Sequence, residues 1–173
     1  MTDTAAVADE LAPVFLELGK ALYICQAFEG TLVLILSLIS HEESNAENGA
    51  FTSAVDIYSQ KTLGKLIGLL AKKIELPPEI EKHLNLGWER RNAIVHRFVH
   101  EHIASLLDPK GRIEAEGVLV KFKQDVKFAD IVANRLLDLC LKKYDLTVTD
   151  LKGNADRLWE YLNPAVDEIS AKH

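Results

Sequence analysis

The sequence predicts an all-α protein, a four-helix bundle with a short C-terminal helical appendage. Apolar residues recur at steps of three and four in long segments, which is the spacing of a buried helix face. Polar stretches rich in turn-forming residues separate those segments. A chain of 173 residues, 48% of them hydrophobic, has enough apolar material for one core. We therefore expect a single helical domain over residues 1–173, with the bundle over about residues 8–145 and the appendage over about residues 146–173.

The first two predicted helices cover residues 8–40 and 53–74. In the first helix, Pro13 fits if it lies in the opening turn, with Asp9 as the N-cap. Residues 41–49 (HEESNAENG) then predict a polar loop. In the second helix, Thr62 marks a cap or a restart. The expected buried stripes are Leu11, Val14, Leu18, Leu22, Cys25, Phe28, Leu32, Ile35 and Ile39 in the first helix, and Leu63, Leu66, Ile67, Leu70 and Ile74 in the second.

Pro77 and Pro78 end the second helix and open a third, over about residues 78–107. Residues 108–111 (DPKG) predict a turn. A fourth helix over residues 113–144 follows, because its steps of four and three outweigh a short strand-like run at residues 118–120. The tail is expected to re-enter helix near residue 154 and to break at residues 163–164. The expected buried positions are Ile80, Leu84, Trp88, Val95, Phe98 and His102 in the third helix, and Ala115, Leu119, Phe122, Val126, Ala129, Ala133, Leu136, Cys140 and Tyr144 in the fourth.

The N-terminal residues and the apolar runs predict a cytoplasmic protein. Residues 1–10 are acidic and lack the basic-then-apolar order of a signal peptide. The longest apolar run, residues 31–39, falls short of the ~20 residues that span a bilayer, so we expect a buried helix segment and no membrane anchor. Cys25 and Cys140 both lie on apolar stripes, as small buried thiols do, which argues against a disulfide or a zinc site.

The net charge of −6 argues against long-range steering of the whole chain onto nucleic acid. Any contact with nucleic acid must therefore be local. Most single charged side chains on a helix simply belong to its solvent-exposed face and bind nothing. The local sources of positive charge are Lys61, Lys65, Lys72 and Lys73 in one segment and Arg90, Arg91 and Arg97 in another.

One polar sequence interrupts the third predicted helix: residues 91–96 (RNAIVH). Asn92 and His96 are four residues apart and share a helix face, so the amide could orient the imidazole or contact a phosphate. Arg91 lies further round the helix, but its long stem could bring the guanidinium back to the same side. Arg91, Asn92 and His96 are the candidate catalytic residues, and they imply no cofactor.

These residues resemble the motif of the HEPN superfamily of helical-bundle proteins, which is an arginine, four to six residues, and then a histidine, often with a polar residue directly after the arginine. The order of elements is also similar over about residues 10–145. Arg90 gives a longer permitted spacing to the same histidine, but Asn92 beside Arg91 favours Arg91. The resemblance implies a metal-independent endoribonuclease of toxin or phage-defence type, a homodimer whose two motifs face one cleft, and in some members a nucleotidyltransferase-type antitoxin as partner.

The residue types suit such chemistry. Cleavage of RNA by its own 2′-hydroxyl needs a base, an acid and positive charge at the phosphate. Histidine titrates near neutrality, and arginine can hold two phosphate oxygens at once.

Three alternatives remain open from the sequence. The chain could be a non-catalytic HEPN-like module that binds a nucleotide or a partner. It could hold a metal through His96 and His100, at the four-residue spacing of helical ligand pairs, with Glu101 and His102 nearby. Finally, Arg91 could only form an ion pair, with Glu89 or Glu101 for example, while His96 only hydrogen-bonds to a neighbour.

Overall fold

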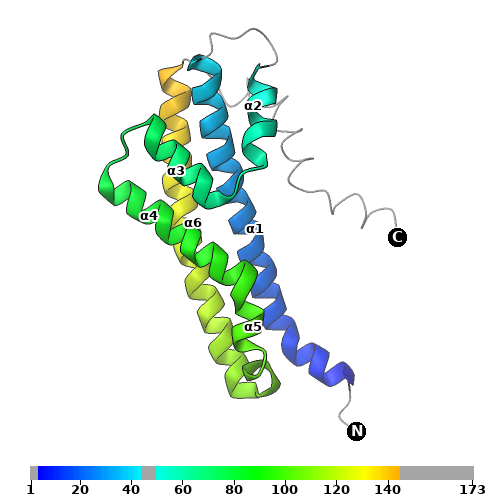
Figure 1. Ribbon diagram of the computed structural model, residues 1–173. Helices are drawn as coiled ribbons and strands as arrows, with labels where there is room; N and C mark the ends of the chain where they lie inside the picture. The colour runs from blue at the N-terminus through cyan, green and yellow to red at the C-terminus, as the bar shows by residue number, and fades with distance from the viewer. Residues whose placement is uncertain (1–3, 44–49, 145–173) are drawn as a thin grey trace. The chain divides into compact units, whose positions relative to one another are not determined.

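The computed structural model describes residues 4–43 and 50–144, and these residues form helices and no strand (Figure 1). The expected all-α class is thus confirmed. The chain divides into two compact units, Met1–Phe28 with Leu76–Val132 and Glu29–Glu75 with Ala133–His173. The predicted C-terminal appendage and the break at residues 163–164 lie outside the described residues.

The first helix, α1 (Thr4–Glu43), is longer than expected at both ends. Pro13 therefore lies inside the helix, and the prediction that it occupies the opening turn with Asp9 as N-cap is wrong. Residues 4–8 (TAAVA) are rich in alanine, the strongest helix former, which extends the helix ahead of the proline. The first part of the predicted polar loop, residues 41–43, is also helical, and residues 44–49 lie outside the described part of the chain.

By length and composition, Asp9–His41 within α1 could cross a membrane. The short apolar run at residues 31–39 underestimated the apolar length of this helix. A longer stretch of sequence remains apolar on average even though it includes isolated polar residues. However, 56% of the apolar window is buried inside the protein. The core helix of a soluble protein has the same character.

In the first unit, the predicted third helix is broken into shorter elements, and residues 108–111 are not a separate turn. The Asp108 carboxylate accepts a hydrogen bond from the backbone N–H of Gly111 at 2.9 Å, so this sequence caps the helix that follows it. In Figure 1 the helix that begins after Asp108 runs back alongside the part of the chain that comes before Asp108. The elements are α4 (Pro78–Asn92), the π-helical turn η1 (Ala93–Arg97), α5 (Phe98–His102), the 3₁₀ turn η2 (Ser105–Leu107) and α6 (Pro109–Lys143).

One apolar core joins α5, η2 and α6 to the N-terminal part of α1. It consists of Val14, Phe98, Leu106, Ala115 and Leu119, all buried. Because Phe98 belongs to this core, it fixes the segment that follows the π-helical turn. The predicted fourth helix is confirmed in α6.

The buried faces of α4 and η1 differ from the expected one. Trp88 is 37% exposed and Val95 is 39% exposed, so the prediction that both are buried is wrong. Gly87 is buried in place of Trp88, and a Cβ atom there would lie only 2.4 Å from the Cβ of Ala129 and 3.0 Å from the ring of Phe28. The spacing of apolar side chains in the sequence does not reveal this close packing of helices, because glycine has no side chain that would appear in such a pattern.

Charged contacts also join α1 to α6 in the first unit. The Glu17 carboxylate accepts hydrogen bonds from Lys123 and from Lys20. These bonds, Lys123 first, lower the pKa of Glu17 below its ordinary value of 4.5. Arg112, which is buried, donates to Glu10 and to the carbonyl oxygen of Leu106 at 3.1 Å.

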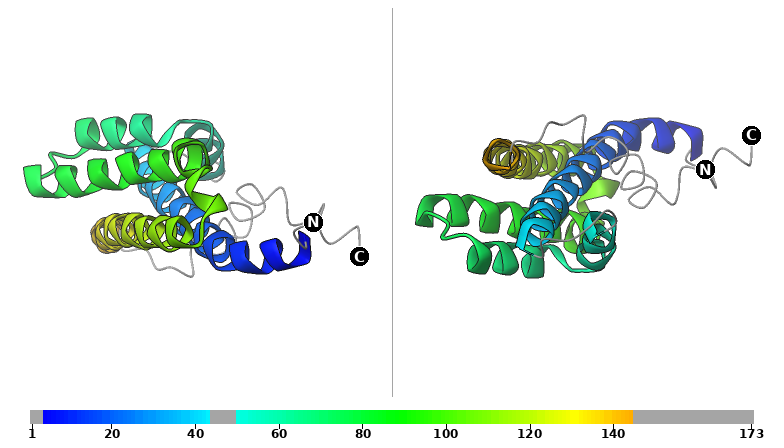
Figure 2. Two further views of the ribbon diagram at one scale, coloured as in Figure 1. Left: turned by 90° about the horizontal axis from the view of Figure 1, so that it is seen from below. Right: turned by 90° about the horizontal axis from the view of Figure 1, so that it is seen from above.

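In the second unit, the single helix predicted over residues 53–74 is two helices, α2 (Ala50–Ser59) and α3 (Leu63–Lys73). Thr62 is the N-cap residue of α3, so the chain does restart there. Figure 2 shows α2 almost end-on and α3 from the side, because the intervening turn changes the chain direction. The predicted buried face of α3 is confirmed for Leu63, Leu66, Ile67 and Leu70.

Cys25 and Cys140 do not form a disulfide. Cys25 is buried, as expected, whereas Cys140 is only half-buried. Burial raises the pKa of the Cys140 thiol, and the nearby charge of Lys143 acts in the opposite direction.

Candidate functional site

The polar sequence at residues 91–96 lies where α4 changes into the π-helical turn η1. The backbone N–H of Phe98 donates to the carbonyl oxygen of Ala93, five residues earlier, instead of the four of an α-helix. Ala93, Ile94 and Phe98 are all buried and hold the turn against the protein. Single π-helical turns inside helices occur frequently at functional sites.

The π-helical turn brings Arg91 and His96 together. Arg91 Nη1 lies 2.9 Å from His96 Nε2. In a regular α-helix, five residues rotate the chain to about 140° from the starting face, so this pair would point apart. One additional residue in the turn returns the histidine to the face of the arginine.

This contact also defines the chemical form of His96. A guanidinium has only donors, so Nε2 must be the acceptor in the Arg91 hydrogen bond. For this contact to form, the ring proton must lie on Nδ1. The His96 side chain is exposed and does not point into the core.

Asn92 contributes to the cluster in a different way from the one expected. Its amide oxygen accepts a hydrogen bond from Arg91 Nη1 at 3.3 Å. The expected direct contact from Asn92 to His96 is replaced by one through the guanidinium. Arg91, Asn92 and His96 are thus close together, with the guanidinium of Arg91 between the other two side chains.

The neighbouring Arg90 has a structural role. Its Nε atom donates to Asp125 Oδ2 of α6 at 2.8 Å, and its guanidinium carbon lies 4.8 Å from the centre of the Phe122 ring. Since Arg90 is held against α6, Arg91 is the arginine that accompanies His96. The sequence could not indicate this, because the partner carboxylate lies 35 residues away.

Two residues of the metal site considered from the sequence, His102 and Glu101, have other contacts. The ring of His102 packs on Phe98 with the ring centres 4.8 Å apart, and Glu101 lies 3.9 Å from Arg97. Among the described residues, no group of three or more His, Cys, Asp or Glu side chains is arranged to hold a metal ion.

The cluster at the start of η1 combines the permanent cation of Arg91 with the imidazole of His96 on an exposed surface. Arg91 can bind an anion, and His96 can accept a proton at the atom that Arg91 now contacts. A phosphate that drew the guanidinium away would therefore release a base beside it. Comparison of the chain with protein-family models, with curated proteins and with solved structures finds no match.

Proposed function

We propose that this chain is a HEPN-like, metal-independent endoribonuclease that cleaves RNA at a cleft between two copies, with the four-helix bundle that its helix order predicts. The observation that carries the proposal is the 2.9 Å contact between Arg91 and His96 on an exposed helix face. The two side chains supply the phosphate-binding group and the proton-transfer group that cleavage by the 2′-hydroxyl requires.

In the proposed reaction, a phosphate of the RNA backbone competes for the guanidinium of Arg91. Two of its oxygens can bind the guanidinium together, which a single imidazole nitrogen cannot match. Nε2 of His96 is then released and accepts the proton of the 2′-hydroxyl. The 2′-oxygen attacks phosphorus, and the 5′-oxygen of the next nucleotide leaves with a proton from the protonated His96 of a second copy of the chain.

One histidine cannot serve as base and acid in the same step, so the proposal requires a second copy of the chain. Exposed apolar side chains on the motif segment support such pairing. Val95 is 39% exposed, Val99 is 46% exposed and Ile103 is 60% exposed. Exposed apolar side chains gathered on one segment are typical of protein–protein contacts.

The test is cleavage of unstructured RNA in the presence of EDTA. We expect His96→Ala to reduce the rate by about 10²–10⁴, the usual contribution of a general base. Arg91→Ala is expected to reduce it by about 10²–10³, as the loss of a charge-stabilising donor does. Arg97→Ala, which removes a neighbouring exposed arginine, is the matched control and should retain activity.

A mixing experiment tests the need for two copies. Inactive His96→Ala protein is added in excess to the unchanged protein, so that most active chains pair with an inactive one. If both histidines are needed, activity falls further than dilution alone explains. Intact RNA after prolonged incubation with pure protein would refute the ribonuclease proposal and favour a nucleotide- or partner-binding module.

A further inference from the structure

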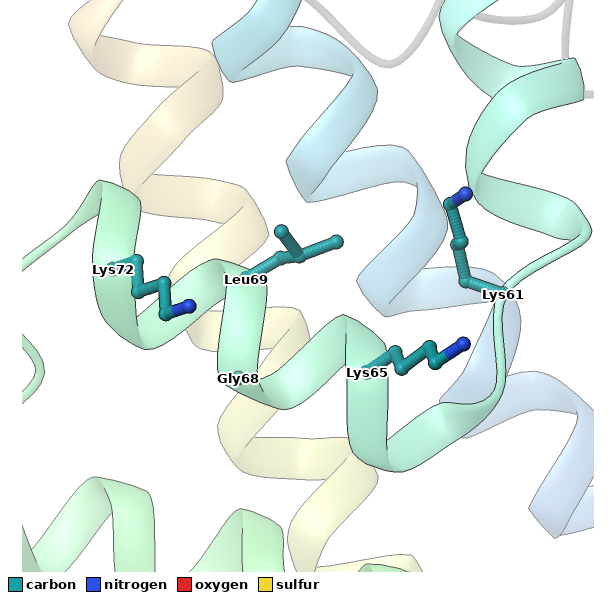
Figure 3. Close-up of a pocket in the computed structure, with 5 residues that line it drawn as sticks. All are labelled: Lys61, Lys65, Gly68, Leu69 and Lys72. Atoms are coloured by element: carbon teal, nitrogen blue, oxygen red, sulfur yellow. The ribbon is translucent and has the colours of Figure 1, made fainter.

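Three lysines surround one hollow on the surface of α3. The hollow has a volume of about 370 Å³ and is lined by Lys61, Lys65, Gly68, Leu69 and Lys72. We call these five residues the lysine hollow. In Figure 3, Lys65 and Lys72 extend in the same direction along α3, and Lys61 stands in the turn that precedes the helix. Lys73 is half-buried and does not line the hollow.

The charges of the lysine hollow have no counterpart in the described part of the chain. No carboxylate there lies within ion-pair distance of Lys61, Lys65 or Lys72, whereas Lys20 pairs with Glu17 at 2.6 Å. Three ammonium groups around one hollow give it a positive potential that attracts an anion. The N-terminus of α3, beside Lys61, adds to the positive potential.

The shape of the hollow indicates an extended anion. Lys65 and Lys72 are seven residues apart, so their positions on the helix are separated by about 10 Å. This distance exceeds one phosphate group and suits successive phosphates of a chain. Gly68 lies between them, and a Cβ atom there would meet nothing within 4 Å, so a ligand can approach the helix backbone.

We propose that the lysine hollow binds single-stranded RNA through its backbone phosphates. A flexible strand can enter a concave surface, whereas a planar lipid surface meets protruding groups first. None of the five lining residues is aromatic, so the contacts are with phosphates and do not discriminate between bases. This binding goes beyond the proposed cleavage and does not require His96.

The experiment measures the dissociation constant of a fluorescent 2′-O-methyl RNA oligonucleotide, which has no free 2′-hydroxyl to attack, by anisotropy between 50 and 200 mM salt. Three phosphate contacts on a single strand give a slope of about −2 for log K against log salt, or roughly a twenty-fold loss of affinity over this range. The variant K61Q/K65Q/K72Q is expected to lose this slope and to bind at least about ten-fold more weakly at 50 mM salt.

Two further variants make the result specific. K121Q/K127Q/K142Q removes the same charge from exposed positions on α6 and should leave most of the affinity in place. Gly68→Glu adds a negative charge where there is space for the side chain, and it replaces the poorest non-proline helix former, so the protein should fold and yet bind weakly. Because the oligonucleotide cannot be cleaved, its binding is measured independently of the proposed cleavage, and Arg97→Gln, which removes an exposed charge outside both sites, should bind as the unchanged protein does.

Unchanged binding in both K61Q/K65Q/K72Q and Gly68→Glu would overturn the proposal. It would equally be overturned if the unchanged protein bound no RNA, or if the lysine variants lost binding only to vesicles containing anionic lipid. An equal loss of binding in K121Q/K127Q/K142Q would show that overall charge, and not the hollow, attracts the RNA.

Discussion

Replacing Arg90, Arg91 and Arg97 one at a time by glutamine is expected to separate three roles within eight residues of sequence. Arg90→Gln should destabilise the fold. Arg91→Gln should abolish RNA cleavage and lower the free energy of unfolding by less than Arg90→Gln does. Arg97→Gln should change neither property by much, because its distance to Glu101 is 3.9 Å and both side chains are more than half exposed.

The magnitude for Arg90 follows from its two contacts. The hydrogen bond to Asp125 is short, at 2.8 Å, but the side chains are 31% and 26% exposed, so solvent screening reduces its contribution to about 1 kcal/mol. The stacking on Phe122 adds about 0.5–1 kcal/mol. Arg90→Gln should therefore lower the free energy of unfolding by about 1–2 kcal/mol and the melting temperature by about 3–6 °C. For Arg97→Gln, an exposed pair at this spacing predicts about 0.3 kcal/mol.

The assays are urea denaturation for stability and RNA cleavage in EDTA for activity. The double variant Arg90→Gln/Asp125→Asn supplies the control: if the pair is the cause, adding the second change should cost little further stability. A result in which Arg91→Gln destabilised the protein more than Arg90→Gln did would refute this assignment. Full cleavage activity in Arg91→Gln would refute the functional role of Arg91.

Three more predictions concern single positions. Gly87→Ala should lower the free energy of unfolding by about 1–3 kcal/mol through overpacking, whereas Gly68→Ala should raise it by about 0.5–1 kcal/mol, as measured by denaturation. Glu17, whose pKa is lowered by its lysine hydrogen bonds, stabilises the protein fully above pH 4.5 and less as the pH falls through its folded pKa; Glu17→Gln should therefore weaken the loss of stability on acidification. In ¹⁵N NMR, neutral His96 should be protonated on Nδ1, and Arg91→Ala should shift it toward the other tautomer; an unchanged spectrum would contradict the hydrogen bond.

Helical periodicity predicted much of the fold. It identified α6 nearly to its ends and the buried face of α3, because both elements bury apolar side chains at regular spacing. It also indicated Thr62 as the position where the chain restarts. These features depend on local sequence, which is why they could be inferred from it.

The errors lie where backbone geometry, and not side-chain hydrophobicity, decides the packing. Gly87 is buried because two helices approach closely there, and this turns the neighbouring Trp88 toward solvent. Pro13 lies inside α1 because residues before it are strong helix formers. The partner of Arg90 is distant in sequence, so only the folded chain identifies Asp125.

The candidate site itself was predicted by residue but not by geometry. Regular α-helical spacing pairs residues four apart, and it therefore favoured contact between Asn92 and His96. An arginine five residues before a histidine is out of phase with an α-helix, and a π-helical turn is the local change that brings the two into phase. Buried Ile94 and Phe98 stabilise that turn, so the apolar residues within and after the motif matter as much as its polar ones. The contact of Arg91 with His96 thus depends on the extra residue in the turn, which removes most of the rotation that separates such a pair in a regular helix.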